Sequence, residues 1–338
     1  MAGPAANQAL LLERNWNDGA VVYKIHFESE DVHGEAAPET RPFVSVHPVA
    51  RWSEEQVFSA FAVSGSSILA IVGGSRHTVV RDTVTQADAP GPRLRDRKRQ
   101  PVMLPVGDDT VVVIDKLLRG GRFEALRRLP GGRWRADPLP TPPVRDLGGH
   151  PDEDGYVACV SAYFAMGTRA WVTVADQGTF SLDTKSGTWR VEGSWELPIR
   201  DRGFFVPELG SVVGLSEVAA PGPSWEQVRQ VCALDVGAGR PPVVRHVWHV
   251  PAERVHGVTE EHVDIDTLGY LGNGRFCLSR SVVVELSKVI QVTFKGKGTS
   301  FTVVDVKRLP GGELELAKCG KRHIHTWPIG HYGQALFL

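Results

Sequence analysis

The 338-residue sequence predicts an all-β fold, a β-propeller whose blades have up to four antiparallel strands. Three observations carry this prediction. Short runs rich in Val, Ile, Leu, Phe and Tyr recur along the chain, helical periodicity is scarce, and 36 Gly with 23 Pro supply many turns. A pattern of strand, glycine turn and strand also returns about every 40–60 residues. Units of this size cannot bury both faces alone, so each must pack against the next.

Five segments show this repeated pattern most clearly. Each has a glycine between two strand-like runs, and these glycines are Gly65, Gly107, Gly167, Gly210 and Gly272. The N-terminal stretch 9–48 contains three more apolar runs and has the length of a further unit. We therefore expect six blades, with five as the alternative. We also expect residues 9–13 to complete a blade by pairing with residues 313–319.

Two shorter patterns predict turns. Residues 128–132 and 308–312 both read Arg-Leu-Pro-Gly-Gly, which places Pro-Gly at the centre of a predicted type II turn between outer strands. Residues 295–299, Lys-Gly-Lys-Gly-Thr, resemble a phosphate-binding loop but join two strand-like runs, so we expect a hairpin turn there. The best helical signals, at 53–61 and 224–231, can also be interpreted as strands.

Composition predicts one domain, residues 1–338, with flexible or loosely packed ends at 1–8 and 321–338. The net charge of −1 gives no global field toward nucleic acid, and no apolar run reaches the roughly 18 residues that span a bilayer. The start of the chain lacks the pattern of a signal peptide. The four cysteines lie far apart and form no Cys-x-x-Cys pair. We expect a cytoplasmic or nuclear protein that is not secreted.

Several phrases in the sequence resemble a known family. They are Phe-Glu-Ala-Leu at 123–126, the strand at Trp134 before Leu-Pro-Thr-Pro-Pro at 139–143, and the stretches 178–189, 193–200, 205–210, 241–248 and 271–277. Together they resemble a large grass family of unknown function, described as kelch-like or F-box-associated propellers, over residues 43–319. The resemblance implies a propeller in a plant cell and no catalytic residue. The chain lacks the regular kelch Gly-Gly doublets and any recognisable F-box helices, which puts an adaptor role in doubt.

The basic stretch 93–135 is the first candidate binding region. It holds twelve Lys and Arg but five Asp and Glu. Its densest part could bind phosphate groups or direct nuclear import; the alternative is a solvated loop between the first two repeats. Few aromatic residues are interleaved with the charges, so binding of nucleic acid is not expected. The candidate binding residues are Arg93, Arg95, Arg97, Lys98 and Arg99.

A second candidate is a polar cluster near the last repeat. Two aspartates alternate onto one face after a group of histidines, which could form a site at the central channel. The alternative is a packed strand followed by a polar loop. The residues are His246, His249, His262, Asp264 and Asp266.

No motif for catalysis or metal binding is present. The sequence has no Gly-x-Ser-x-Gly, no Gly-Lys-Ser/Thr phosphate loop and no His-Glu-x-x-His. His323 and His325 could share a strand face, but they lie in a stretch that we place beyond the last blade strand and lack a third ligand. Most of the nine tryptophans lie in strand patterns, where they are expected to pack between blades. We expect no cofactor and no metal, and a non-catalytic module for a protein or peptide partner; the alternative is an enzyme or small-molecule-binding protein with a site at the central channel.

Overall fold

The computed structural model describes most of the chain. The described residues are 8–15, 19–27, 44–52, 58–118, 123–144, 158–219, 227–250, 258–260, 267–289, 292–326 and 333–337. Within these ranges all elements of regular secondary structure are β-strands, so the all-β prediction is confirmed. The same residues contain no helix long and apolar enough to cross a membrane.

The first three sheets have four strands each. One joins the two ends of the chain in the order β25-β1-β2-β3, and the next two run from β4 to β7 and from β8 to β11. Their strands are β25 Gly333–Phe337, β1 Gln8–Asn15, β2 Gly19–Phe27, β3 Val44–Trp52, β4 Phe58–Ser64, β5 Ser67–Val72, β6 Thr78–Asp82, β7 Asp88–Pro90, β8 Pro101–Pro105, β9 Thr110–Asp115, β10 Glu124–Arg128 and β11 Trp134–Pro138.

The remaining strands form two larger sheets. An eight-stranded sheet, in the order β15-β14-β13-β12-β16-β17-β18-β19, consists of two antiparallel runs joined by a parallel bridge between β12 and β16. The last sheet has the order β20-β22-β23-β24, with β21 also paired to β22. Their strands are β12 Val160–Met166, β13 Arg169–Val174, β14 Gly178–Asp183, β15 Thr188–Gly193, β16 Arg200–Val206, β17 Ser211–Ala219, β18 Gln227–Gly237, β19 Arg240–Trp248, β20 Val258–Glu260, β21 Thr267–Gly272, β22 Arg275–Val289, β23 Val292–Arg308 and β24 Leu314–Thr326.

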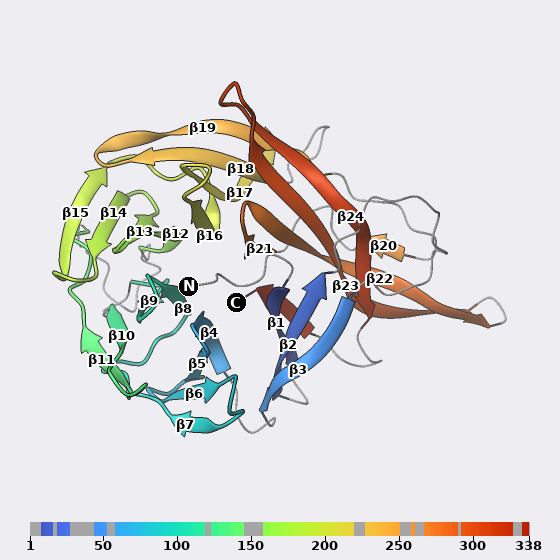
Figure 1. Cartoon of the computed structure of the whole chain (residues 1–338), viewed down its shortest axis with the longest axis horizontal. Coiled ribbons are helices and arrows are strands. Elements are labelled where there is room, and N and C mark those ends of the chain that lie inside the picture. The colour runs from blue at the N-terminus through green and yellow to red at the C-terminus, as the bar shows by residue number, and fades with distance from the viewer. Residues whose placement is uncertain are drawn as a thin grey trace, which may run out of the picture.

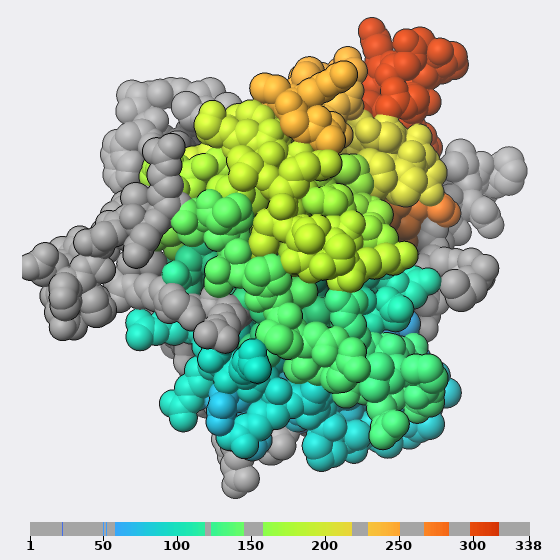
Figure 2. All heavy atoms as spheres, turned by 90° about the vertical axis from the view of Figure 1, so that its left-hand side faces the viewer, coloured from blue at the N-terminus to red at the C-terminus, as the bar shows by residue number. Residues whose placement is uncertain are grey.

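The sheets are set around a common centre, as in a propeller. Figure 1 shows β4, β8, β12 and β16 toward the middle, and β7, β11, β15 and β19 at the periphery. In Figure 2, segments that follow one another in the chain form successive blocks along one side of the molecule. The predicted propeller is therefore confirmed. The topology gives five sheets, one of them eight-stranded, so the number of blades, six or five, stays a prediction.

The hydrophobic core lies between neighbouring sheets. One cluster joins Phe123, which precedes β10, to Phe180 on β14. Another joins Trp171 on β13 to Val212 on β17, and Trp171 is fully buried with its ring stacked on Phe164 at 5.5 Å between centroids. The first cluster thus draws side chains from consecutive sheets, and the second from the two antiparallel runs of the eight-stranded sheet, as radial packing requires. The prediction that strand tryptophans fill space between blades holds for Trp171.

Burial separates inner from outer strands. All six residues of β9 are buried, whereas all three of β7 are exposed. A strand flanked by others within its sheet and covered on both faces favours apolar residues, which explains the run Val-Val-Val-Ile at 111–114 in β9.

The glycine turns lie where the sequence places them. Each of the five predicted glycines lies at the turn between two paired strands: β4–β5, β8–β9, β12–β13, β16–β17 and β21–β22. The three N-terminal apolar runs also form strands, β1 to β3. The stretch 224–231, left open between helix and strand, enters β18 at Gln227.

Three expectations are corrected. The first strand pairs with β25, for instance Leu12 with Leu336, and not with 313–319, because those residues belong to β24 and already pair with β23. Residues 321–326 likewise continue β24 and do not lie beyond the last blade strand. Residues 295–299 form no turn, since they lie inside β23 and pair with β22. The flexibility expected at 1–8 and 321–338, and the single-domain organisation, stay predictions.

The two Arg-Leu-Pro-Gly-Gly motifs join outer strands as expected, but their turns differ. At the first, the Gly132 N–H donates to the Leu129 carbonyl at 3.1 Å and Gly131 has φ +82°, which is a type II turn. At the second, the Gly312 N–H donates to the Leu309 carbonyl at 2.8 Å, but a positive φ occurs at Gly312 and not at the preceding glycine. The type II prediction is therefore wrong for the second motif.

Candidate functional site

A basic loop connects two neighbouring sheets. Residues 91–100 run from β7, at the periphery, to β8, close to the centre (Figure 1). The loop begins on the ladder of its own sheet: the Gly91 N–H donates to the Thr78 carbonyl, and the Leu94 N–H donates to the Arg76 carbonyl, both at 2.8 Å. Such outer-to-inner connections lie at one end of the sheets, where variable loops on a rigid scaffold carry recognition.

A buried carboxylate holds the middle of this loop. Glu124 on β10 accepts hydrogen bonds from the backbone N–H of Arg95 and from the ammonium of Lys98, both at 2.8 Å. The side chains of Lys98 and Glu124 are 0% and 1% exposed. A buried ion pair is tolerated because each charge has its partner and further hydrogen bonds. The structure therefore separates Lys98 from the four arginines with which the sequence groups it, and makes it part of the anchor.

A second buried carboxylate holds the end of the loop. Asp115 closes β9 and is 3% exposed. Its two oxygens accept the backbone N–H groups of Arg99 and Gln100, each at 3.0 Å. Leu94, also buried, packs with Met103 and others in the core between the two sheets. The backbone of the loop is thus fixed at several points.

The four arginines of the loop lie on its outer side. Arg93, Arg95, Arg97 and Arg99 are exposed, whereas Leu94 and Lys98 between them are buried. Within the described part of the chain, no carboxylate, carbonyl or aromatic ring partners any of these four side chains. The Arg76 side chain adds a further cation nearby by donating to the Arg95 carbonyl at 3.1 Å. The result is a fixed surface of unpaired guanidinium groups, which we call the arginine loop.

The predicted histidine cluster is only partly described. His246 lies on the outer strand β19 and stacks on Trp248 with ring centroids 5.3 Å apart, and His249 is exposed just after the strand. His262, Asp264 and Asp266 lie outside the described residues, so the polar cluster stays a prediction. The side chains of His323 and His325 also lie outside the described part of the chain. Among the residues that are described, no group of three His, Cys, Asp or Glu could hold a metal ion.

Two of the described cysteines have thiols with a raised pKa. Cys159, Cys232 and Cys277 are free. Burial raises the pKa of Cys232 to about 11 and that of Cys277 well above its ordinary value. Both remain protonated at neutral pH, and a protonated thiol is a poor nucleophile.

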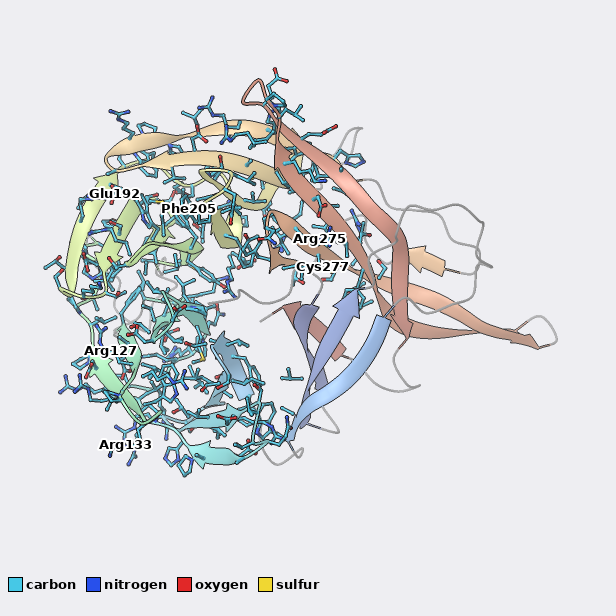
Figure 3. The ribbon with its side chains drawn as sticks, in the orientation of Figure 1. Arg127, Arg133, Glu192, Phe205, Arg275 and Cys277 are labelled. Carbon is cyan, nitrogen blue, oxygen red and sulfur yellow. The ribbon has the colours of Figure 1, made fainter. Side chains whose placement is uncertain are left out.

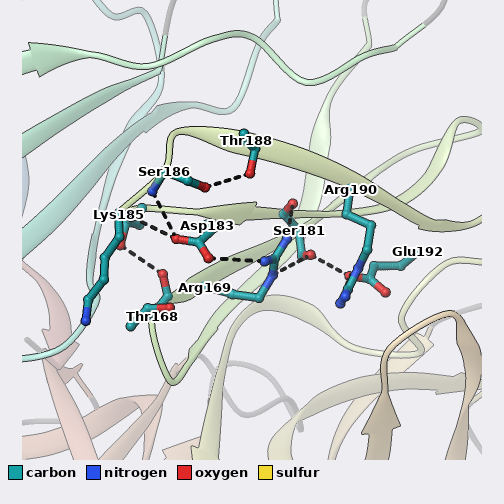
Figure 4. A network of polar contacts seen from close by, with 10 residues as sticks. Thr168, Arg169, Ser181, Asp183, Lys185, Ser186, Thr188, Arg190 and Glu192 are labelled. Carbon is teal, nitrogen blue, oxygen red and sulfur yellow. Dashed lines mark hydrogen bonds and ion pairs between the residues drawn. The ribbon is translucent and has the colours of Figure 1, made fainter.

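A second arginine-rich region lies on β13, β14 and β15 (Figure 4). Arg169 donates to the Ser181 hydroxyl at 3.0 Å and to Asp183 at 3.4 Å. Arg190 donates to Glu192 at 2.7 Å. Both guanidinium groups have carboxylate partners, so this region is a structural network.

Glu192 connects that network to the next strand pair. It lies on the outer strand β15 (Figure 3) and accepts from the Ser181 hydroxyl and, at 2.8 Å, from the backbone N–H of Gly239. Burial would raise the pKa of Glu192, but hydrogen bonds from Ser181, Arg190 and Gly239 outweigh it and lower the pKa. Its carboxylate therefore ties two runs of strands together.

Arginines also link sheets elsewhere. The Arg308 guanidinium of the second Arg-Leu-Pro-Gly-Gly motif donates to the carbonyl of Leu209 in the turn between β16 and β17. Arg127 donates to the carbonyl of Thr184. Arg127 and its exposed neighbour Arg133 are seen in Figure 3. These contacts explain part of the basic bias of 93–135 without any ligand.

Sequence reasoning missed the two carboxylates that hold the backbone of the arginine loop. Asp115 lies 15 and 16 residues from the two N–H groups that it binds, and Glu124 lies 26 residues from Lys98 and 29 from Arg95. One local signal was present. Glu124 stands inside the apolar run Phe-Glu-Ala-Leu, and a charged residue within such a run lies in or beside a buried part of the strand. A charge there requires a partner, and the basic run 93–99 offers one.

Comparison with known proteins finds one family and several solved structures to which the chain is similar. The chain is similar to the solved structure of a protein from Lactobacillus plantarum, with 10% sequence identity and a TM-score of 0.49. The match covers 97% of this chain and 99% of that protein. It is similar to the periplasmic gluconolactonase of Pseudomonas aeruginosa, at 10% identity and TM-score 0.44 over 95% and 99% of the two chains. For the Swd1 β-propeller domain of Myceliophteria thermophila the identity is 9% and the TM-score 0.43, over 90% and 92%. A search of curated proteins gave no match.

The family match covers nearly the whole chain. Residues 8–325 match DUF1668, described as a protein of unknown function. This agrees with the resemblance to a family of unknown function, while grass origin and the kelch-like and F-box features stay predictions. The match spans the arginine loop and its two anchoring carboxylates, and the chain belongs to the DUF1668 family.

Proposed function

We propose that the protein is a non-catalytic interaction module that binds an acidic segment of a protein partner on the arginine loop. One observation carries this proposal: four exposed guanidinium groups, which have no partner among the described residues, stand on a backbone that two buried carboxylates hold in place. Guanidinium groups recognise carboxylates through paired hydrogen bonds. A loop that is already ordered loses little conformational entropy on binding.

The alternatives receive less support from the described residues. Nucleic acid would also be attracted by four arginines, but aromatic side chains for base stacking are absent from residues 91–100. A propeller of kelch-like type, a plant cell and a cytoplasmic or nuclear location remain part of this proposal. An enzyme with a site at the centre is the second candidate; one feature of the inner strands favours ligand binding there and is treated below.

The test uses charge reversal with a matched control. A fluorescent ten-residue oligoglutamate peptide is titrated with the full-length protein, with Arg95→Glu/Arg97→Glu, and with Arg133→Glu/Arg240→Glu. The control arginines are exposed too and have no partner in the described part of the chain, so both variants change the net charge equally. We expect the loop variant to weaken binding about tenfold or more and the control to weaken it less than about threefold.

Two results would overturn the proposal. Equal losses in both variants would show that net charge, not the loop, attracts the peptide. Tighter binding of a ten-nucleotide single strand than of the peptide, with a steep dependence on salt, would assign the loop to nucleic acid.

A further inference from the structure

The innermost strands of the eight-stranded sheet meet at an irregular point. Between Arg200 and Phe204, β16 leaves its register with β17 and pairs in parallel with β12, so that Arg202 lies opposite Tyr163. Asp201 at this bulge has φ +57°, a conformation that costs energy for a residue other than glycine. Both strands lie toward the centre of the molecule (Figure 1). Bulges of this kind redirect side chains and are common beside functional sites.

The bulge presents a guanidinium group that has no hydrogen-bond partner. The Nε of Arg202 is buried and makes no hydrogen bond, and no carboxylate or carbonyl of the described residues bonds to the rest of the group. Its carbon lies 4.9 Å from the centroid of the Phe204 ring. Stacking of this kind fixes the plane of the guanidinium group while its N–H edge stays available. Leaving a buried donor without an acceptor is costly.

The adjacent carboxylate does not neutralise Arg202. Asp201 is paired instead with the Lys116 ammonium at 2.6 Å and with Arg229 at 3.6 Å. Two cations therefore pair with this one carboxylate. Arg202, the next residue along the chain, adds a further positive charge.

Tyr163 adds a neutral donor beside Arg202. Burial raises its pKa to about 12, partly offset by the positive charge of Arg202. The phenol is therefore protonated at neutral pH and can donate a hydrogen bond to an anion. Burial also lowers the pKa of Arg202, but the ordinary pKa of an arginine is so high that the guanidinium group stays charged at neutral pH.

We propose that Arg202 and Tyr163 bind a small organic anion at the inner end of the β12–β16 bridge, through a carboxylate or phosphoryl group of that ligand. Two oxygens of the ligand would accept the guanidinium edge, and the phenol would donate to one of them. Lys116 and Arg229 would contribute longer-range attraction while remaining paired with Asp201. This site is distinct from the arginine loop and needs no protein partner.

The experiment measures binding of inorganic phosphate and of succinate by calorimetry. The background is the full chain with Arg93→Ser, Arg95→Ser, Arg97→Ser and Arg99→Ser, so the arginine loop cannot contribute. In it we expect Arg202→Met to weaken binding of the preferred anion about 10- to 100-fold and Tyr163→Phe to weaken it several-fold. Arg200→Met, two residues away and paired with Glu217, is the control and should leave binding within about twofold.

Thermal unfolding separates a binding role from a structural one. Without added anion, Arg202→Met should melt at the same temperature as the background or higher, because it removes a buried charge that has no partner. The anion should raise the melting temperature of the background but not that of the variant. The proposal is overturned if neither anion binds the background, if Arg202→Met binds as well as the control, or if Arg202→Met alone lowers the melting temperature as a structural residue would.

Discussion

Two arginine-rich regions of this molecule treat the same side chain in opposite ways. On β13 and β15, Arg169 and Arg190 donate to carboxylates of their own sheet. In the arginine loop the carboxylates bind backbone N–H groups and Lys98, and the guanidinium groups have no partner in the part of the chain that the structure describes. Both regions are ordered by buried acids. They differ in whether the arginine side chains pair with carboxylates of the protein itself.

This difference separates structure from function. A paired arginine on a sheet is explained once its carboxylate is found. An exposed cluster on an ordered loop has no such explanation, since four like charges repel one another and add nothing to folding. The functional candidate is therefore the region where the fold fixes the backbone but leaves the charges unpaired.

The largest expected effect comes from the loop anchor. Replacing Glu124→Leu leaves Lys98 buried without a counter-charge, so we expect a loss of about 3–5 kcal/mol in the free energy of unfolding, measured in urea at pH 7. The double variant Lys98→Met/Glu124→Leu should lose less than the single one, because no buried charge is left alone. A single variant that unfolds like wild type would show that this ion pair does not hold the loop.

The sequence predicts the strands better than their long-range partners. Hairpins around Gly65, Gly107 and Gly167 follow from local turn chemistry and alternation, so they were predictable. The strand that closes the first sheet was misassigned because residues 313–319 read as a stronger strand than 333–337. The stretch 295–299 was misassigned for the opposite reason: its glycines signal a turn, but pairing of a long hairpin overrides them, with Gly296 opposite Val284.

A medium effect is expected at Glu192, and it depends on pH. Its pKa in the folded state lies below the ordinary value of 4.5, since hydrogen bonds from Ser181, Arg190 and Gly239 outweigh burial. The stabilisation is therefore present above about pH 4.5 and is lost as pH falls through the folded pKa. We expect Glu192→Gln to unfold with about 1–3 kcal/mol less free energy at pH 7, and the difference from wild type to shrink toward pH 3. A difference that is the same at both pH values would mean that the charge of Glu192 is not what holds the two strand runs.

The candidate site was predictable in part. The run of charges at 93–99 marks the arginine loop, and composition suffices to find it. Which of its cations are buried depends on Glu124, 26 residues from Lys98, and no local pattern reports such a contact. The role proposed for Arg202 could not be found from the sequence. It depends on a β-bulge and on the salt bridge between Lys116 and Asp201, and neither follows from a local pattern.

The smallest effect tests the comparison most directly. Arg169→Gln removes hydrogen bonds to Ser181 and Asp183 from a half-buried side chain, so we expect a loss of about 1 kcal/mol in thermal or urea unfolding. Arg97→Gln removes a guanidinium group that has no hydrogen-bond or ion-pair partner among the described residues, so stability should stay within about 0.5 kcal/mol of wild type. Equal losses in the two variants would mean that Arg97 has a partner in the folded chain, and the arginine loop would then be part of the scaffold. A loss confined to Arg169→Gln leaves the charge of the loop free for a ligand.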